Sequence, residues 1–418
     1  MIKGNPFLSE NFSSIWEEHF NEGKMGRVFK SIYPLRFVRH GLLPILSNSG
    51  GTLTKGIDYQ LDENATDILG ENILLIYDVP TYFEIVTGRR QKNLGFYCAK
   101  QYPGYLIDLE EYKDIAHFMS STFSKSSRYK LNKYKRRLEE CFDIEYRMWC
   151  GDMSKDEYDR LFYQFRKLLE KRFDDKGTVN NNLDTEEWNF YYDVAYPMIV
   201  EKQAALFVIY DSGVPIGITL NYFSDTVVFD AITVFDIDYS KFHLGSVTIM
   251  KLIEWSIENK YRKLDFSKGF FEYKTRWANS TYDFEYHIYY DSTSFKAKLL
   301  ANGLKKFFDL KQLMRDKKLN EKLHRLRYRL RRDTSQEVSY SKYTLTEMDC
   351  NFDFVGLETV DLKTNENTFL KPIAFEFLYL NNECIKNLKI FKSEGEDIEY
   401  MFRGISKNMG LSFSKRPN

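Results

Sequence analysis

The sequence predicts an α/β protein with more than one domain, and three observations support this prediction. The chain has 418 residues, which is more than one hydrophobic core usually supports. Short β-like runs occur between segments with helical spacing over much of residues 27–290. Aromatic residues make up 17% of the chain and prolines number only 9, which indicates a packed globule rather than a disordered chain.

Charge and cysteine content narrow the classes of partner. Lys plus Arg and Asp plus Glu are equal at 60 each, so net charge gives no reason to expect nucleic acid or a membrane as the main partner. The five cysteines include no C-x-x-C pair, so neither a disulfide framework nor a zinc site is indicated, and we expect no metal. Without a signal peptide or a long apolar run, the sequence predicts a cytoplasmic protein, with peripheral contact at the inner face of the membrane left open.

The first half combines one helix with several short strands. Phe12, Ile15, Trp16 and Phe20 recur at helical spacing behind Ser9, which can cap the helix. Turn signals then separate β-like runs at residues 27–32, 35–38, 72–77, 95–99 and 105–109.

A basic helix is predicted at the start of the second half. Leu131, Tyr134 and Leu138 form its apolar stripe. Its cations, with no acid among them, are Lys125, Arg128, Lys130, Lys133, Lys135, Arg136 and Arg137. They form either a solvated face or a site for a coenzyme or substrate phosphate.

The rest of the second half alternates helices and strands. A strand at 143–149 precedes helices at 154–172 and 185–202. The remaining elements are a hairpin at 205–222, a strand at 227–234, a loop at 236–245, a helix at 246–259 and a strand at 284–290.

Residues 261–277 have the most specific pattern in the chain. Leu264 and Phe266 alternate as in a half-buried strand, Gly269 ends it, and Tyr273 and Trp277 lie on one helical face. The segment is therefore predicted to be a strand, a glycine loop and a short helix.

Three motifs in this order resemble the CelD-like acyltransferases of the GNAT superfamily, which are akin to the FemAB transferases. They span about residues 100–290. The first is Tyr105–Leu109 with the basic run 124–138, the second is Phe235-Asp236 with Tyr239 and Leu244-Gly245, and the third is Asp265–Gly269 with Tyr273-Lys274 and Trp277. The sequence His243-Leu244-Gly245 stands where that family has S-P-G, and the R-x-x-G-x-G/A loop of ordinary GNAT enzymes is absent.

The resemblance implies tandem GNAT-like halves with mixed, partly splayed sheets, in which an acyl-thioester arm lies between two diverging strands. The predicted domains are an N-terminal half at 1–122, a C-terminal acyltransferase half at 123–294 and a basic amphipathic helix at 295–333. A shift in composition after Arg332 also predicts an appended small domain at 334–418. The implied activity is transfer of an acyl group from acetyl-CoA or another acyl-CoA to an amine. The acceptor would be an amino sugar or amino acid moiety in cell-surface polysaccharide assembly.

Candidate site residues follow from what acyl transfer requires. Gly245 and the amides of Ser246 and Val247, at a helix start, suit a pyrophosphate. Among the nearby carboxylates Asp230, Asp236 and Asp238, the motif favours Asp236 as the acceptor of the amine's proton.

The third motif supplies the remaining candidates. By analogy with GNAT enzymes, Tyr273 would protonate the leaving thiolate, and Lys274 could hold a substrate carboxylate or phosphate. Asp265 and Gly269 would shape the loop beside the coenzyme.

Two other functions remain open. A FemAB-type enzyme would take its acyl group from aminoacyl-tRNA, which the basic helix 125–137 could bind. A non-catalytic scaffold would use the predicted helix at 295–332, with fourteen Lys and Arg against three acids, to contact a membrane. Residues 334–418 show β-like runs at 352–360, 373–380 and 388–391 and match no motif of the family.

Overall fold

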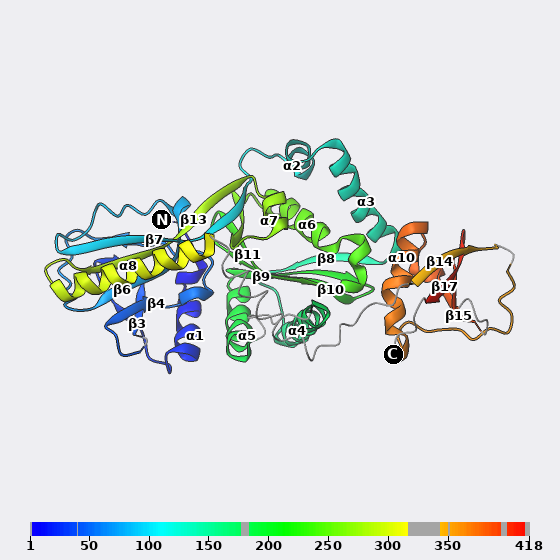
Figure 1. Ribbon diagram of the computed structural model, residues 1–418, viewed down its shortest axis with the longest axis horizontal. Helices are drawn as coiled ribbons and strands as arrows, with labels where there is room; N and C mark the ends of the chain where they lie inside the picture. Colours follow the sequence, from blue (N-terminus) through cyan, green and yellow to red (C-terminus); the bar gives the residue numbers. More distant parts are fainter. Residues whose placement is uncertain are drawn as a thin grey trace.

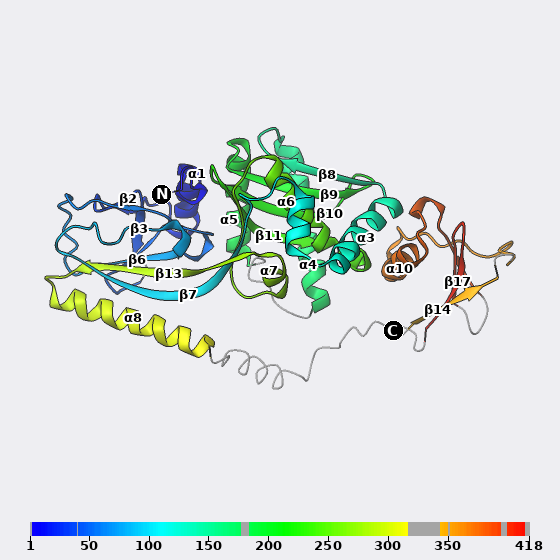
Figure 2. The same cartoon turned by 90° about the horizontal axis from the view of Figure 1, so that it is seen from above.

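The protein is built around one eleven-stranded mixed sheet, seen edge-on in Figure 1. The computed structural model describes residues 2–39, 41–176, 184–316, 343–349, 352–393 and 399–413. The strand order is β1-β3-β4-β6-β13-β7-β12-β11-β10-β9-β8. The first half, the second half and a C-terminal unit follow one another along the longest axis of the molecule (Figures 1 and 2).

The first half supplies one end of this sheet and a pair of helices. Ser9 caps α1 by accepting a hydrogen bond from the Phe12 amide, as the sequence predicts. The elements are α1 (Glu10–Phe20), β1 (Arg27–Val28), β3 (Arg36–Arg39), β4 (Ile45–Asn48), β6 (Ile73–Pro80), β7 (Leu94–Asp108), β13 (Ser280–Asp291) and α8 (Phe295–Asp316). A separate small sheet pairs β2 (Ile32–Tyr33) with β5 (Gln60–Leu61).

The second half supplies the other end of the sheet and most of the helices. The predicted strands, hairpin and helices are confirmed with small shifts at their ends, and the predicted loop after β11 contains the 3-10 helix η5 (Ile237–Phe242). The helices are α2 (Ile115–Thr122), α3 (Lys125–Cys141), α4 (Lys155–Lys176), α5 (Thr185–Val200), α6 (Leu244–Glu258) and α7 (Glu272–Trp277). The strands are β8 (Ile144–Trp149), β9 (Ala204–Asp211), β10 (Val214–Phe223), β11 (Val227–Phe235) and β12 (Lys263–Lys268).

Helices cover both faces of the sheet, so its central strands are buried on both sides. In Figure 1, α1, α4 and α5 lie below the strands, and α2, α3, α6 and α7 lie above them. β9 is buried along almost its whole length because Leu206 and Val208 face one core while Ala205 and Phe207 face the other.

Strand pairing joins the two halves into one sheet. β12 pairs antiparallel with β7, with Leu264 opposite Ile107. β13 lies between β6 and β7, although residues 280–294 were assigned to the second half from the sequence. The chain therefore returns to the first half after α7, and α8 packs on β7 and β13.

The C-terminal unit is a four-stranded sheet with one helix, α10 (Lys371–Asn381). Its strands are β14 (Tyr343–Met348), β15 (Lys389–Lys392), β16 (Tyr400–Arg403) and β17 (Asn408–Phe413). The β-like run at 373–380 was wrongly predicted, because an unbroken apolar run of this length also suits a buried helix, and Pro372 stands in its first turn. No strand forms at 352–360 among the described residues.

The structure describes the first part of the predicted helix at 295–333. The predicted helix begins at Phe295 and continues to Asp316, and the remainder of the predicted segment 295–333 lies outside the described residues. Within the described ranges, no helix is both long enough and apolar enough to cross a membrane.

Candidate functional site

The candidate site lies where two parallel strands diverge. β11 and β12 pair only from Val227–Phe229 to Lys263–Asp265, near the start of both strands. A pocket of about 460 Å³ occupies the space beyond this pairing. Its lining comes from α4, β11, η5, α6 and α7: Arg172, Asp230, Thr233, Phe235, Ser240, His243, Leu244, Gly245, Ser246, Ile249, Glu272, Tyr273, Arg276 and Trp277.

The start of α6 forms one wall of the pocket. Gly245 and Ser246 line it as predicted, whereas Val247 is buried in the core behind it. The amides of Ser246 and Val247 donate to the His243 carbonyl, so they are not the free donors that the sequence suggested. The amides of Leu244 and Gly245 have no acceptor among the described residues, and both belong to the pocket wall.

Gly245 also permits close packing at this wall. A Cβ atom at this position would lie 2.7 Å from Cε1 of Phe235, so the aromatic ring can sit against α6 only because position 245 is glycine. The Arg172 guanidinium lies over the same ring, 4.4 Å from its centroid, and donates to the Thr233 carbonyl at 3.4 Å. Arg172 thus brings a cation from α4 into the pocket, which no sequence motif indicated.

The pocket is lined by two carboxylates, the buried Asp230 and the exposed Glu272, and Asp236 is not part of the lining. Asp230 is 8% exposed, accepts a hydrogen bond of 2.7 Å from Thr233 Oγ1, and has its pKa raised by burial. Asp236 caps η5 by accepting from the Asp238 amide and forms an ion pair of 2.5 Å with Lys171. The Lys171 ammonium also forms an ion pair of 2.6 Å with Asp238, so both loop aspartates are paired with the same lysine.

Tyr273, the predicted proton donor, belongs to the pocket lining. It lies on α7, lines the pocket and is 40% exposed. Burial of the hydroxyl and the nearby Asp230 carboxylate raise the pKa of Tyr273, while Arg172 opposes this shift. The side chain therefore remains a neutral phenol near neutral pH.

Lys274 has a different environment from the one expected for a substrate-binding cation. It is 5% exposed, and its Nζ donates to the carbonyls of Ser267 at 3.3 Å and Lys268 at 2.9 Å. Burial lowers the pKa of Lys274 to about 8. The side chain fixes the glycine loop and does not line the pocket.

Asp265 and Gly269 also fix the conformation of this glycine loop. The buried Asp265 carboxylate accepts hydrogen bonds from the Ser267 amide and the hydroxyls of Tyr82 and Tyr282, and burial raises its pKa to about 6. Gly269 has φ +99, which favours glycine, and its amide donates to the Pro103 carbonyl of β7. Both residues position the loop without lining the pocket.

A group of charges connects the site to the first half. Lys268 Nζ lies 2.5 Å from the fully buried carboxylate of Asp78. Burial and the charge of Lys268 lower the pKa of Lys55 to about 8. The carboxylates of Asp78, Asp230 and Glu187 oppose this shift. No local sequence pattern marks these residues, because they are far apart in the chain and their charges come together only in the folded protein.

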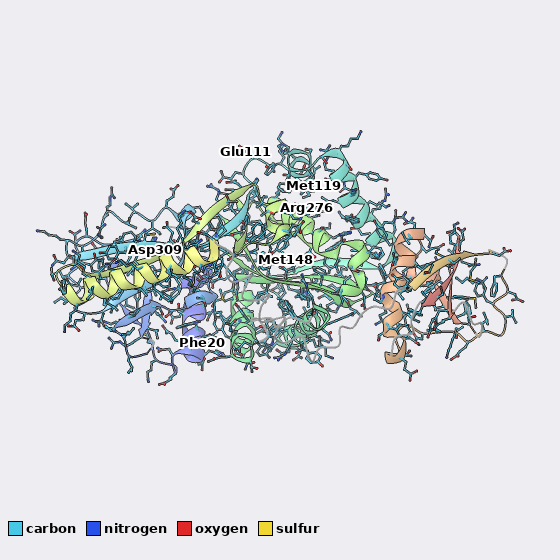
Figure 3. All side chains as sticks on the ribbon, in the orientation of Figure 1. Phe20, Glu111, Met119, Met148, Arg276 and Asp309 are labelled. Atoms are coloured by element: carbon cyan, nitrogen blue, oxygen red, sulfur yellow. The ribbon has the colours of Figure 1, made fainter. Side chains whose placement is uncertain are left out.

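The basic helix α3 borders the mouth of the pocket. Tyr134 stacks on His243, with 3.9 Å between ring centroids, and His243 lines the pocket. Figure 3 labels Arg276, a cation of the lining, and Met119 of α2 on the same side of the sheet. The larger cavity of the C-terminal unit, about 1030 Å³, is lined by no tyrosine and by no residue of the three motifs.

Comparison with known proteins places a family domain on this site. Residues 125–275 match the acetyltransferase (GNAT) domain, a range that includes every lining residue of the pocket except Arg276 and Trp277 at the end of α7. The predicted resemblance is therefore confirmed at the level of the GNAT superfamily. No curated protein matches the sequence significantly.

Comparison with solved structures finds several similar chains. A conserved protein of unknown function from Bacteroides thetaiotaomicron is 10% identical, with a TM-score of 0.44 over 69% of this chain and 92% of that one. L-PGS from Bacillus licheniformis is 12% identical, with a TM-score of 0.42 over 73% and 98%. FemX is 9% identical, with a TM-score of 0.44 over 68% and 92%.

Proposed function

Since residues 125–275 match an acetyltransferase (GNAT) domain, we propose that the chain transfers an acyl group from an acyl-CoA to an amine. One observation carries this proposal. The pocket between the diverging strands β11 and β12 holds a buried carboxylate, a neutral phenol and two unused backbone amides at a helix start. These are the groups that direct acyl transfer requires.

The anionic part of the donor suits the cationic wall of the pocket. The amides of Leu244 and Gly245 lie in the first turn of α6, where the helix dipole also favours an anion. Arg172 and Arg276 add two cations to the lining. These groups would hold the pyrophosphate, and the gap between β11 and β12 would receive the acyl-thioester arm.

The reaction then needs two proton transfers. The acceptor reacts as the neutral amine, after its ammonium form has lost one proton to solvent. Asp230 then accepts a second proton from the attacking nitrogen while the nitrogen forms a bond to the thioester carbonyl carbon. The tetrahedral species collapses, the carbon–sulfur bond breaks, and Tyr273 protonates the thiolate. The proton on Asp230 returns to Tyr273, which lies close enough for the two groups to interact electrostatically. We thus assign to Asp230 the role that the motif gave to Asp236.

The amine would approach from the opposite face of the sheet. A cavity of about 510 Å³ there is lined by Glu22, Glu186 and Glu187, and an acidic lining suits a protonated amine. Lys55 interacts with Glu187 of this cavity and with Asp230 of the donor pocket, so it lies between the two. Within this class, an amino sugar or amino acid moiety of a cell-surface polysaccharide precursor is the acceptor that we propose, on the family resemblance.

Donor binding can be tested by thermal unfolding with acetyl-CoA, longer acyl-CoAs and free CoA. A ligand that binds only the native protein stabilises it by about 2.7 kcal/mol at a hundred times Kd. We expect stabilisation of the wild type by one acyl-CoA, and its loss in Gly245→Trp and in Arg276→Glu. The control is Gly303→Trp, because Gly303 is also helical and has no neighbour within 4 Å of an added Cβ. No stabilisation of folded wild-type protein by any of these ligands would overturn the proposal.

Aminoacyl-tRNA is the second candidate donor, because α3 borders the same pocket. Lys125 and Lys130 are exposed, and the Tyr134–His243 stack links their helix to the pocket mouth. If tRNA is the donor, Lys125→Glu with Lys130→Glu will weaken tRNA binding and reduce its salt dependence. Tight binding of an acyl-CoA with no effect of this pair would exclude this donor.

Peripheral contact with the inner face of a membrane is proposed for α8. Ala297, Ala301 and Phe308 of this helix are buried against the protein body. A second set on the helix is exposed, namely Phe295, Leu299, Phe307, Leu310, Leu313 and Met314. If these side chains enter a bilayer, Phe307→Ser with Leu310→Ser will reduce sedimentation with anionic liposomes, and unchanged sedimentation would contradict this contact.

A further inference from the structure

A cluster of three potential metal ligands lies in the first half, outside the acyl-transfer site. Cys98 of β7 is directly opposite His287 of β13 in the antiparallel ladder, and Glu285 precedes His287 by two positions on the same strand. The ligand atoms of Cys98, Glu285 and His287 all lie within 4.8 Å of one another. The geometry points to a site for one zinc ion, a site that we propose from these residues.

The three side chains offer the set of atoms that zinc takes. A thiolate, an imidazole nitrogen and a carboxylate oxygen are its usual protein ligands, and three of them leave a fourth position for water or another ligand. One thiolate and one carboxylate would also neutralise a divalent cation. The two nearby lysines are already paired with other carboxylates, Lys100 with Asp283 and Lys305 with Asp309.

A second layer of side chains already orients the histidine. His287 is 3% exposed, and its Nδ1 lies 2.5 Å from the Tyr59 hydroxyl, which in turn lies 2.7 Å from the Tyr289 hydroxyl. When Nδ1–H donates to Tyr59 and the Tyr59 hydroxyl donates to Tyr289, His287 Nε2 is free to bind metal. A hydrogen-bonded partner on the far ring nitrogen is the usual companion of a metal-bound histidine.

The site is accessible from one side. The Nε2 atom lies 2.9 Å from Glu285 Oε2, and the Glu285 side chain is 25% exposed. Phe96 packs against the imidazole, with ring centroids 5.1 Å apart, and closes the other side. An ion could therefore enter past Glu285 and would link β7 to β13.

Titration of the chelator-treated full chain with Co²⁺ tests this site. We expect one equivalent to bind, with a thiolate-to-metal absorption band and the visible bands of tetrahedral Co²⁺, and Zn²⁺ should displace it. Cys98→Ser should abolish the thiolate band, whereas the matched control Cys150→Ser, which removes another half-buried thiol, should retain it. Tyr59→Phe should keep the band but lower affinity about tenfold or more.

Thermal unfolding separates loss of the site from loss of the fold. Zn²⁺ should raise the Tm of the wild type and of Cys150→Ser, and it should not raise that of Cys98→Ser or His287→Gln, with each metal-free variant measured alongside. Absence of stoichiometric binding to the wild type would overturn the proposal. A thiolate band that survives in Cys98→Ser would also overturn it.

Discussion

The two halves each contain a parallel pair of strands, and the pocket that we propose for the donor lies beside the pair of the second half. In the first half, β4 pairs with β6 from Ile45–Ser47 to Ile73–Leu75, and the Asn48 side chain then accepts a hydrogen bond from the Tyr77 amide. In the second half, no such side chain bridges β11 and β12 beyond their pairing among the described residues, and α6 starts beside the gap. The two pairs therefore differ in whether a side chain bridges the strands and in whether a helix start faces the gap.

The charges differ in the same sense. The cavity beside β4 and β6 is lined by Glu22, Glu186 and Glu187 and by no Lys or Arg, whereas the pocket beside β11 and β12 contains Arg172 and Arg276 together with Asp230 and Glu272. An anionic donor and a cationic amine would thus approach from opposite faces of the sheet and meet near Asp230.

The largest expected effect is that of Asp230→Asn on acyl transfer. Loss of a positioned general base costs typically about 100- to 10,000-fold in rate. The assay is release of free CoA from the acyl-CoA that stabilises the protein, with amino-sugar acceptors such as glucosamine. The matched control is Asp236→Asn, because Asp236 pairs with Lys171 outside the pocket lining. If Asp236→Asn loses more activity than Asp230→Asn, the motif-based assignment was right and ours is not.

Tyr273→Phe should lower kcat by about 100-fold with little change in KM, because only the leaving thiolate needs its proton. The hydroxyl is removed without loss of the ring, which contacts Phe266 edge-on. The comparison is Tyr163→Phe, an exposed tyrosine of α4 away from the pocket. Equal kcat in wild type and Tyr273→Phe would remove this residue from the proton path.

Asp265 predicts a pH dependence of stability. Its folded-state pKa is about 6, above the usual value near 3.9, so between these pH values the folded state binds more protons than the unfolded state. The contribution to the free energy of unfolding is therefore complete below about pH 4 and falls by roughly 2–3 kcal/mol as pH rises to about 6.5. The difference in unfolding free energy between wild type and Asp265→Asn measures this loss. A difference that stays constant over that range would contradict it.

Glu187→Gln should have the smallest effect. Loss of one partly exposed charge is worth about 1 kcal/mol or less, so KM for a cationic acceptor should rise by up to about fivefold, with binding of the acyl-CoA unchanged. Glu258→Gln, at the exposed end of α6, is the control. A change in acyl-CoA affinity instead of acceptor KM would reverse the assignment of the two cavities.

The sequence identified the elements of the site better than its atoms. The order of β11, α6, β12 and α7, the loop at Gly269 and the position of Tyr273 follow local patterns that a single sequence carries. The assignment of the general base to Asp230 instead of Asp236 does not follow from a local pattern. It depends on the ion pair between Asp236 and Lys171, and Lys171 lies on α4, which is distant in the chain.

Two other features also depend on contacts between distant segments. Arg172 reaches the pocket only because α4 packs beside the end of β11. β13 lies between β6 and β7 because its alternating residues find partners on two strands at once, and a strand pattern alone does not specify which strands those are.

Hydrogen–deuterium exchange with and without the stabilising acyl-CoA tests the central comparison most directly. The account predicts protection of residues 243–247 at the start of α6 and of residues 272–277 in α7, with no change at residues 45–48 and 73–77 around the corresponding pair of the first half. Protection around β4 and β6, with none at α6 and α7, would contradict it.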